Sequence, residues 1–578
     1  MVESFKRRGQ KFIRRFSRTS AKVGLSGKEH LRTNLVERVS HIRNIRLLIL
    51  EWGILILALF TLSLAQAFWL RDSYAVQTFV DGGSYVEATI GRVNSMNPLF
   101  ATTNSEKALS RLMFATLTTN DFTGNSGPGL AEKLVASEDG KVWTMKLREG
   151  LKWSDGEALT NDDVIFTINL IKDPVVNSVY STNLKMVEVS MNEAGEIVFT
   201  LPSPYVAFSS VLEFPIVPKH KLENVPLKTL VEDDFSINPV TSGAFSFNAR
   251  QILPTGDEEV IYLARNPYYY LGETLLDSFA IRTFGDKDAL IRAMNSGAVT
   301  GTAELSGPEV SEISLDSFVE QKTSLNTGVF MFFNTSRSPL NNKSLRAAIR
   351  KGINLELVRE SVPDVAPLDY PFIDSCITLS KYPEIPKYDF NVARQQVDEI
   401  MGGALVDLNI ATVNSGYLPL VADSIKNQLA ALGFGVNVYV YNETQDFIAN
   451  IISNRSYDIL IYDTEFGEDP DLLPYYHSSQ ARATGLNLSN YSNAIVDNLL
   501  VAARETLNSE LRIKKYETFL EYWVADTPAI GLYRSNLSYV HNQNARAYSQ
   551  ERQLVTALDR FNDVVNYAST KGFEKKTP

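Results

Sequence analysis

Hydrophobic and polar positions alternate along the chain with the periods of both strands and helices. Trp143, Met145 and Leu147 alternate with polar residues, which predicts a half-buried strand. Residues 160–171 open with a capping-box pair and continue with apolar residues on one face, which predicts a helix. From about residue 74 onward, the sequence therefore indicates a large domain of mixed helix and strand.

A strand, a helix and a second strand are predicted in succession between residues 405 and 441. The apolar patterns of residues 405–413 and 436–441 are typical of strands. Between them, residues 418–432 form an amphipathic helix that ends at Gly433. Such a unit implies parallel pairing of the two strands through a right-handed crossover, so the fold class is α/β.

The next apolar run, residues 459–462, leads directly into an acidic loop. Ligands of open α/β sheets bind beyond the carboxyl ends of the strands, so this loop is a candidate binding site. A solvated acidic turn is the alternative interpretation. The acidic residues of the loop are Asp463, Glu465, Glu468 and Asp469.

A continuous apolar stretch covers residues 47–70, which are 24 residues with a single charge, Glu51. At a rise of about 1.5 Å per residue, a helix of this length can cross a hydrocarbon core of roughly 30 Å. Residues 1–46 contain 13 Lys and Arg against 3 Asp and Glu. The positive-inside rule then predicts a single transmembrane helix in the cell membrane, with a cytoplasmic N-terminus and a large extracytoplasmic domain.

Two alternatives for the N-terminal region stay open. The A-x-A-like sequence at residues 65–67 resembles a cleavage site, so the apolar stretch could belong to a signal peptide, although 46 preceding residues make an unusually long leader. The basic segment of residues 1–46 is interpreted as a topology signal that attracts anionic lipids. A cytoplasmic partner or RNA is the competing interpretation, but on the first one no nucleic acid is expected.

Composition supports a folded protein, and its uneven charge suggests two compartments or two partners. The 578 residues carry 56 Lys and Arg against 67 Asp and Glu, and 44% are hydrophobic, which is too apolar for a disordered chain. Residues 1–46 have a formal charge of +10 and the remaining residues one of −21. The single cysteine, Cys376, excludes a disulfide scaffold and offers no lipidation site after the apolar stretch.

The sequence contains none of the common catalytic or metal-binding motifs. There is no G-x-S-x-G, G-x-x-x-x-G-K-[ST], H-E-x-x-H or paired C-x-x-C pattern. Two of the five histidines fall in the basic leader and three are isolated in sequence, which favours ordinary surface or core positions over metal ligation. We therefore expect no enzymatic activity, no metal and no cofactor.

Several stretches, in order, resemble the family 5 extracellular solute-binding proteins, the peptide-, dipeptide- and nickel-type receptors of ABC importers. The most specific match is EDGKVWTMKLREGLKWSDGEALTNDDVIFT at residues 138–167, which is similar to the family signature D-G-x-x-x-x-x-x-L-R-x-G-V-K-W-x-D-G-x-x-x-T-x-x-D-V. The resemblance covers about residues 78–545. Shorter matches lie at residues 97–100, 129–132, 238–243, 264–269, 333–334, 345–349, 467–470, 487–493, 496–497 and 528–533.

The resemblance implies two α/β lobes joined by two chain crossings. This is a periplasmic-binding-protein-like fold of type II, in its large three-subdomain variant, here preceded by a single transmembrane helix. A ligand would lie in the cleft between the lobes, where contacts from both lobes exist only in the closed state. We place the first lobe at residues 72–322 with an inserted subdomain at about 105–235, the second lobe at 323–535, a return to the first lobe at 536–565 and a tail at 566–578.

The resemblance also suggests which loop residues meet a ligand. In peptide-binding members, an aspartate a few residues before the D-P turn pairs with the α-amino group of the ligand, and that place falls on Phe466 when counted back from Asp469. Either Glu465 or Asp463 takes this role by a small shift of register, or the ligand has no amine. A charge-assisted contact in a closed cleft is stronger than one at a surface.

Three further residues are candidates for ligand contacts. Asn487 and Tyr491 match a segment that lines the cleft in relatives and could offer amide and phenol hydrogen bonds, while a plain loop with a packed tyrosine is the alternative. Arg92 stands where some relatives place a cleft acid, so it could meet a ligand carboxylate. A solvated surface arginine is the alternative for Arg92.

The sequence thus predicts a membrane-anchored monomeric receptor that delivers oligopeptides to separate permease and ATPase subunits. The alternatives are a two-lobed sensor that has lost import and a receptor for a non-peptide solute such as a nickel chelate or a sugar. An extracytoplasmic hydrolase is disfavoured because nucleophile and metal motifs are missing from the sequence.

Overall fold

A computed structural model describes residues 46–254, 258–314, 316–363, 365–373, 377–442 and 445–575. The chain divides into two compact units. One unit has residues 46–78 and 571–575 as its described part, and the other is formed by residues 79–570. Cys376 and the two histidines of the basic leader lie outside the described residues.

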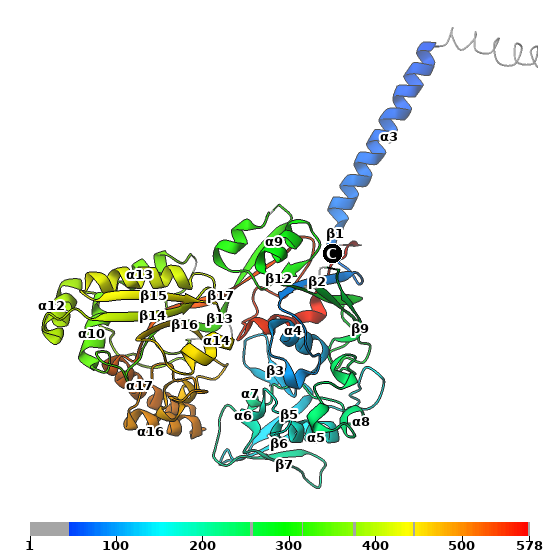
Figure 1. Cartoon of the computed structure of the whole chain (residues 1–578). Helices are drawn as coiled ribbons and strands as arrows, with labels where there is room; N and C mark the ends of the chain where they lie inside the picture. The colour runs from blue at the N-terminus through cyan, green and yellow to red at the C-terminus, as the bar shows by residue number, and fades with distance from the viewer. Residues whose placement is uncertain are drawn as a thin grey trace, which may run out of the picture. The chain divides into compact units, whose positions relative to one another are not determined.

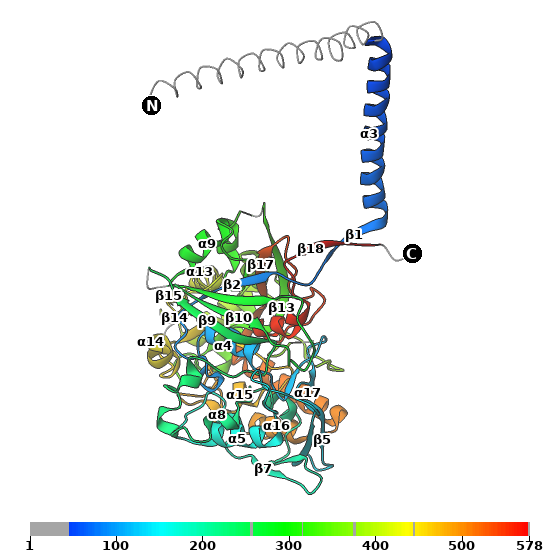
Figure 2. The same ribbon diagram turned by 90° about the vertical axis from the view of Figure 1, so that its right-hand side faces the viewer.

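The smaller unit contains one helix and two short strands. Helix α3 (Arg46–Tyr74) includes the apolar stretch that the sequence predicts to be helical. Strands β1 (Ala75–Phe79) and β18 (Lys571–Lys575) pair with each other and lie side by side in Figure 2. Within the described ranges, no helix combines the length and the apolar character that a membrane span requires.

The larger unit is built on one sheet of ten strands that runs through two lobes (Figure 1). The strand order is β15-β14-β16-β13-β17-β12-β2-β11-β10-β9. The long strands β13 (Phe318–Phe333) and β17 (Ala529–Asn542) pair antiparallel in the middle of this order, with register shifts near Ser324 and Val329. These two strands carry the chain from one lobe to the other.

The first lobe contains residues 79–317 together with the segment that follows β17. Strand β2 (Ser84–Ile90) pairs parallel with β11 (Ser278–Phe284), and β10 (Glu259–Arg265) pairs antiparallel with β11 and with β9 (Phe245–Ile252). The main core of this lobe gathers side chains from residues 85–281 and 537–567, so the late segment is required to complete it.

A smaller antiparallel sheet lies within the first lobe, with strand order β5-β6-β8-β7. Strand β6 (Val142–Leu147) buries Trp143 and Met145, which confirms the predicted strand. Helix α5 (Asn161–Lys172) begins after Thr160 with the predicted capping box. The other strands are β5 (Ala131–Ala136), β7 (Glu188–Met191) and β8 (Ile197–Thr200).

The second lobe contains the predicted strand, helix and strand. Strand β14 (Asp407–Val413) pairs parallel with β15 (Gly435–Tyr441), and helix α13 (Leu418–Ala431) connects them, which confirms the predicted crossover unit. Strand β16 (Ile459–Glu465) pairs parallel with β14 and antiparallel with β13. A second core, with side chains from residues 329–533, fills this lobe.

The remaining elements cover the sheets or connect the strands. In the first lobe they are η2 (Pro98–Phe100), α4 (Asn104–Met113), β3 (Thr118–Asn120), β4 (Ser126–Pro128), α6 (Ser181–Leu184), α7 (Phe208–Val211), α8 (Lys219–Leu222), η3 (Leu227–Thr229), η4 (Asp234–Ser236), α9 (Lys287–Asn295), β12 (Gly301–Thr302), η5 (Gly307–Glu312) and η8 (Ala557–Asn566). In the second lobe they are α10 (Lys343–Gly352), α11 (Leu355–Glu360), α12 (Phe390–Met401), α14 (Gln445–Phe447), η6 (Ile448–Ile452), α15 (Leu473–Tyr476), η7 (Ser478–Gln480), α16 (Ala494–Glu505) and α17 (Ser509–Asp526).

Candidate ligand-binding site

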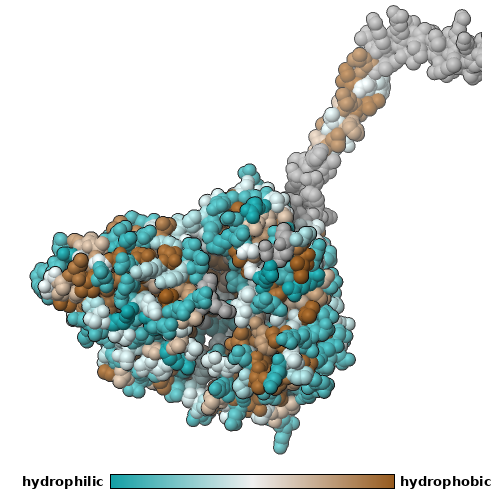
Figure 3. All heavy atoms as spheres, viewed as in Figure 1, coloured by the Kyte–Doolittle hydropathy of each residue, from teal (hydrophilic) through white to brown (hydrophobic). Residues whose placement is uncertain are grey.

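The surface between the two lobes is hollowed (Figure 3) and holds three neighbouring cavities. The hinge cavity, of about 520 Å³, lies against β13 and β17. The central cavity, of about 650 Å³, lies between α4, η8 and the end of β16. The outer cavity, of about 660 Å³, lies between residues 182–211 of the first lobe and residues 467–504 of the second. Glu465 lines both the hinge and the central cavity.

The two lobes touch at both ends of this row of cavities. At the hinge end, Gly307 has a positive φ of +57°, and a Cβ atom there would lie 2.7 Å from the ring of Tyr417. At the outer end, the backbone N–H of Val206 donates to the carbonyl of Arg504 over 3.2 Å. The Arg504 guanidinium also stacks 5.0 Å above the ring centre of Tyr205. The three cavities therefore lie between two sets of interlobe contacts.

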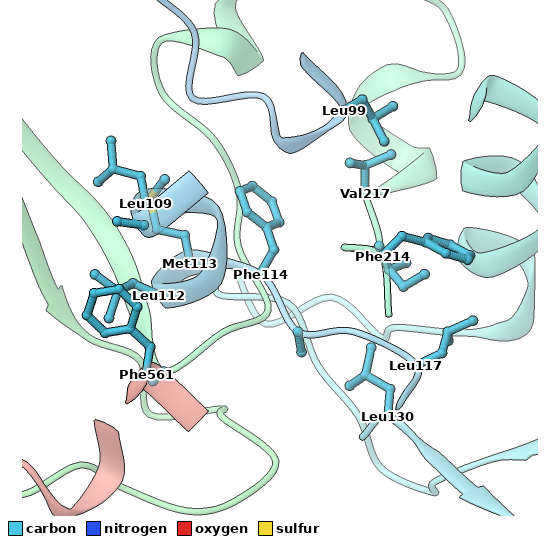
Figure 4. Packing of buried hydrophobic residues seen from close by; sticks show 14 of the residues in the cluster. Leu99, Leu109, Leu112, Met113, Phe114, Leu117, Leu130, Phe214, Val217 and Phe561 are labelled. Atoms are coloured by element: carbon cyan, nitrogen blue, oxygen red, sulfur yellow. The ribbon is translucent and has the colours of Figure 1, made fainter. Parts of the chain in front are cut away.

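Helix α4 forms part of the first-lobe wall of the central cavity. Asn104, Lys107 and Arg111 are three and four residues apart, so they share one helical face, and they line the cavity. Leu109 and Leu112 occupy the opposite face and pack into the core (Figure 4). The amphipathic pattern of the helix thus places two cations at the cleft.

Arg111 is paired with two carboxylates of the first lobe. It forms ion pairs with Glu213 and, over 2.9 Å, with Asp559. Asp559 is buried and also accepts the backbone N–H groups of Val555 and Thr556 over 3.0 and 2.8 Å. Burial raises the pKa of Glu213, although the Arg111 charge opposes this shift. Arg111 is therefore fixed by its partners and is already neutralised.

A second buried ion pair lies behind the same wall. The Nε and Nη2 atoms of Arg560 donate to Oε1 of Glu87 over 3.0 and 2.7 Å. The other carboxylate oxygen of Glu87 accepts the Tyr539 hydroxyl over 2.6 Å, and Glu87 is fully buried. Arg560 also lines the central cavity. The charge of Arg560 is neutralised by Glu87. Without Arg560, Glu87 would be a buried carboxylate with no counter-charge, which is strongly unfavourable.

The second-lobe wall carries carboxylates of a different kind. Asp463 and Glu465 are exposed toward the cavities because side chains alternate along β16, while Thr464 is turned inward. The Glu465 carboxylate has no ion pair or hydrogen bond with any described residue. Desolvation in the recessed cleft raises its pKa to about 7, and Asp559 and Asp463 add to this effect against the opposing charge of Lys107.

Glu468 follows in the same loop and faces the acids of the first lobe. Its Oε2 atom is buried and finds no hydrogen-bond partner among the described residues. Desolvation raises the pKa of Glu468 to about 8, with further contributions from Glu213, Asp469 and Asp559. In the part of the chain that the structure describes, these two carboxylates of the second lobe therefore stand opposite the first lobe without a partner for their charge.

The lysine of α4, Lys107, is a cation that lies near Glu465. The Lys107 ammonium lines the central cavity together with Glu465, and it has no ion-pair partner within 4 Å among the described residues. Glu304, on the same wall, accepts a hydrogen bond from Asn104 over 3.1 Å, and desolvation raises its pKa. The central cavity is thus lined by one cation, Lys107, and one carboxylate, Glu465, that have no ion-pair partner among the described residues.

Phe466, Asn487 and Tyr491 lie in the core of the second lobe and not on a wall of the three cavities. Phe466 is 3% exposed, and its ring packs against Phe330 and Tyr475 at centroid distances of 5.9 and 4.9 Å. The Asn487 side chain donates to the carbonyl of Tyr491 over 2.9 Å and accepts its N–H over 3.0 Å. The Tyr491 hydroxyl donates to Asp526 over 2.7 Å. These contacts build a turn and a packed core.

Arg92 and Asp469 have different surroundings. Arg92 is exposed and does not line any of the three cavities. Asp469 lines the outer cavity, but both of its oxygens accept hydrogen bonds from Arg512, one of them over 2.6 Å. In the part of the chain that the structure describes, no group of three or more His, Cys, Asp and Glu side chains has a metal-binding arrangement.

Comparison with known proteins identifies the family. Residues 126–484 match the model of the bacterial extracellular solute-binding proteins, family 5. The chain belongs to this family. It is 24% identical over 493 residues to the oligopeptide-binding protein AppA of Bacillus subtilis (strain 168), an alignment that covers 81% of this chain and 89% of the relative.

Solved structures share the fold. The structure of AppA from Bacillus subtilis in complex with a nonapeptide has a TM-score of 0.68 at 21% identity and covers 84% of this chain and 99% of that chain. The structure of NikZ from Campylobacter jejuni in complex with Ni(L-His) has a TM-score of 0.70 at 21% identity, with the same coverage. The two-lobed α/β architecture is thus confirmed, and the two neighbours that share it are in complex with different ligands, a nonapeptide and Ni(L-His).

Proposed function

We propose that this protein is an extracytoplasmic receptor that binds oligopeptides between its lobes and delivers them to an ABC permease. The observation that carries the proposal is the Glu465 carboxylate, which lines both the hinge and the central cavity and has no ion-pair partner among the described residues. A ligand ammonium placed there would supply the missing partner in a charge-assisted hydrogen bond. Asp463, two residues earlier on β16, adds negative charge beside it.

The arrangement of the walls supports binding that depends on closure. Lys107 comes from the first lobe and Glu465 from the second, so a ligand that meets both is fully held only when the lobes are together. Lys107 can donate to a carbonyl or carboxylate oxygen of the ligand, so the two walls offer the ligand groups of opposite charge. The protein then acts by binding alone, without a chemical step, and permease and ATPase are separate subunits.

The ligand retained by the purified protein tests this proposal. The full chain is purified in detergent and denatured, and the released small molecules are identified by mass spectrometry. We expect a set of short peptides with free N-termini. A metal chelate or a sugar released in stoichiometric amount would contradict peptide binding and move the assignment to the non-peptide members of the family.

A matched pair of peptides tests the role of Glu465. A peptide with a free N-terminus is compared with its N-acetylated form by calorimetry. We expect the acetylated form to bind at least about tenfold more weakly, because it cannot place a positive charge at Glu465. Equal affinities would assign the binding to other contacts and leave Glu465 without this role.

We also propose that residues 47–70 anchor a monomeric protein in the membrane, with residues 1–46 beside the anionic lipids of the cytoplasmic face. This proposal rests on the sequence: one charge in 24 residues, preceded by 13 cationic ones. Extraction of isolated membranes at alkaline pH should leave the protein in the membrane fraction. A soluble mature form whose N-terminus is Phe68 would instead support cleavage after Ala67.

A further inference from the structure

A further cavity, of about 630 Å³, lies within the second lobe and is called here the lobe-2 cavity. Its walls come from residues 334–337 after β13, from the adjacent strands β14 and β15 (Figure 1), from residues 451–457 before β16 and from Asn490. It shares no lining residue with the hinge, central or outer cavity. A ligand in the lobe-2 cavity therefore does not displace a ligand from the cleft between the lobes.

The charged side chains of the lobe-2 cavity are all cationic. Among the described residues that line it, Arg337 and Arg455 are charged, and the other polar ones are four asparagines, two serines and three tyrosines. Each of the three cavities between the lobes is lined by two or more carboxylates instead. The residues after position 46 have a formal charge of −21, so a cavity lined by cations without acids stands apart from the rest of the chain and favours an anion.

Arg455 is a buried cation without a counter-charge. The residue is 7% exposed, and it has no ion-pair partner among the described residues. Its guanidinium donates to the backbone carbonyls of Ile452, Arg482, Gly485 and Asn487, while its buried Nε atom finds no hydrogen-bond partner in the described part of the chain. A buried charge is unfavourable unless an opposite charge compensates it, so Arg455 lacks an anion.

The backbone at Arg455 is strained. Its φ is +51°, in the left-handed region that glycine adopts freely and that a residue with a Cβ atom rarely adopts. Glycine would remove the strain, and it would also remove the guanidinium from the cavity wall. Strain of this kind is typical of residues whose side chain is needed in one place.

Arg337 supplies the second cation of the cavity. Its side chain is 48% exposed, and Nη1 lies 3.4 Å from Oδ1 of Asp458. Asp458 also accepts the backbone N–H and the side-chain amide of Asn409, each over 2.9 Å. A guanidinium has five N–H donors, and this ion pair occupies Nη1, so Arg337 retains donors for a ligand.

We propose that the lobe-2 cavity binds a small phosphate ester that carries hydroxyl groups, such as a sugar phosphate. Arg337 and Arg455 would meet the phosphate, because the guanidinium fork matches its oxygens in geometry and charge. The neutral amides, hydroxyls and phenols of the lining suit the hydroxyl groups of the ester. The volume has room for more than a bare anion and lies within the roughly 300 to 1,000 Å³ of small-molecule sites. This site goes beyond the proposed function and does not depend on it.

Calorimetry on the full chain in detergent, in a buffer without phosphate, tests the site with glucose 6-phosphate and glycerol 3-phosphate as probes. We expect at least one of the two esters to bind in a ratio of one to one, at least about tenfold more tightly than inorganic phosphate, and glucose not to bind. If neither ester binds, the site is overturned. Equal affinity for inorganic phosphate would overturn the assignment to an ester.

Arg337→Gln locates the binding. This substitution should weaken ester binding at least about tenfold, because it removes the exposed cation of the cavity. Both it and the control below change a partly exposed ion pair, so neither should shift the unfolding temperature by more than a few degrees.

Arg394→Gln is the matched control. Arg394 lies on α12 of the same lobe, pairs with Asp398 over 3.2 Å, has a side chain that is 39% exposed and lines none of the four cavities. Ester binding should be unchanged in this variant. An ester that binds equally well to wild type and to Arg337→Gln would lie elsewhere and overturn the site. Equal weakening in both variants would indicate attraction by net charge alone and would overturn it as well.

Discussion

The two walls of the central cavity use charge in opposite ways. On the first lobe, Arg111 and Arg560 are each held by carboxylates, and the most buried of these, Glu87, is fully excluded from solvent. On the second lobe, Glu465 and Glu468 have no partner for their charge among the described residues, and their pKa values are raised to about 7 and about 8. The arginines of the first-lobe wall are thus neutralised by carboxylates, whereas the glutamates of the second-lobe wall are not neutralised by any described residue.

This difference separates structural charges from charges that await a ligand. Paired buried ions hold segments together, and their loss leaves an uncompensated charge in a region of low polarity. Unpaired carboxylates at a closing interface are unfavourable until a proton or a cation joins them. Substitutions in the ion pairs of the first-lobe wall should therefore change the free energy of unfolding. Substitutions of the carboxylates on the second-lobe wall should change the ligand affinity and the pH dependence of closure.

The largest expected effect is on the stability of the first wall. Arg560→Met keeps most of the side-chain volume but leaves the buried Glu87 without its cation, so the free energy of unfolding should fall by about 3–5 kcal/mol. Urea unfolding followed by circular dichroism measures this change. The double variant Glu87→Gln with Arg560→Met should recover part of the loss. A decrease below about 1 kcal/mol would mean that this pair is not structural.

A substitution on the second-lobe wall should change the affinity for peptides instead of the stability. Glu465→Gln removes the charge and keeps the shape, so the affinity for peptides with a free N-terminus should fall about 10- to 100-fold, while the unfolding free energy stays within about 0.5 kcal/mol of wild type. Calorimetry on both proteins measures the affinity. Asp463→Asn, on the same strand, should have a smaller effect. Loss of stability without loss of affinity would remove the contrast between the walls.

The acidity of Glu468 predicts that closure depends on pH. Its pKa is raised to about 8 in the cleft against an ordinary value near 4.3, because of desolvation and the facing Glu213, Asp469, Asp559 and Asp121. The protonated form therefore favours closure; this contribution is complete below about pH 4.3 and is lost as the pH rises through about 8. Small-angle scattering of the ligand-free protein should show expansion over this range.

Substitution at Glu468 identifies the group responsible for that expansion. Arg111, Arg512 and Arg552 also lie near the acids that face Glu468, but arginine keeps its charge over this pH range. Glu468→Gln should therefore remove most of the expansion and leave a smaller part due to Glu465. A wild-type radius of gyration that is constant from pH 5 to pH 9 would contradict the prediction.

Local patterns were sufficient to predict much of the fold. The crossover unit of β14, α13 and β15 follows from apolar periodicity and one terminal glycine, and the structure contains it. The position of Glu465 at a strand end also follows from the strand pattern. The alternation of side chains along β16 also predicts that Asp463 and Glu465 lie on one face and Phe466 on the other, as the structure has them.

Other features of the site depend on tertiary packing and have no local signal. Arg111, Glu213 and Asp559 lie more than 100 residues apart in the chain, and only the folded first lobe brings them together. Asn487 and Tyr491 were predicted as ligand contacts from the resemblance alone, and in the structure their polar groups bond to their own turn and to Asp526. These hydrogen bonds join residues that only the folded second lobe brings together.

The smallest expected effect concerns the contact between Tyr205 of the first lobe and Arg504 of the second. Tyr205→Leu removes the stacking of Arg504 on the half-buried tyrosine ring, a contact worth about 0.5–1 kcal/mol or more, and leaves the hydrogen bond from Val206 to Arg504 in place. Because the stacking exists only between touching lobes, its loss should weaken peptide binding about two- to fivefold.

Tyr268→Leu provides the control for the same kind of contact within one lobe. Lys152 lies 5.2 Å from the Tyr268 ring centre, and both residues belong to the first lobe, so this substitution removes a similar attraction without touching closure. Peptide affinity should be unchanged in Tyr268→Leu. If both variants bind peptide as tightly as wild type, the Arg504 contact does not contribute to closure. The affinity would then depend on the second-lobe carboxylates, which have no partner for their charge among the described residues.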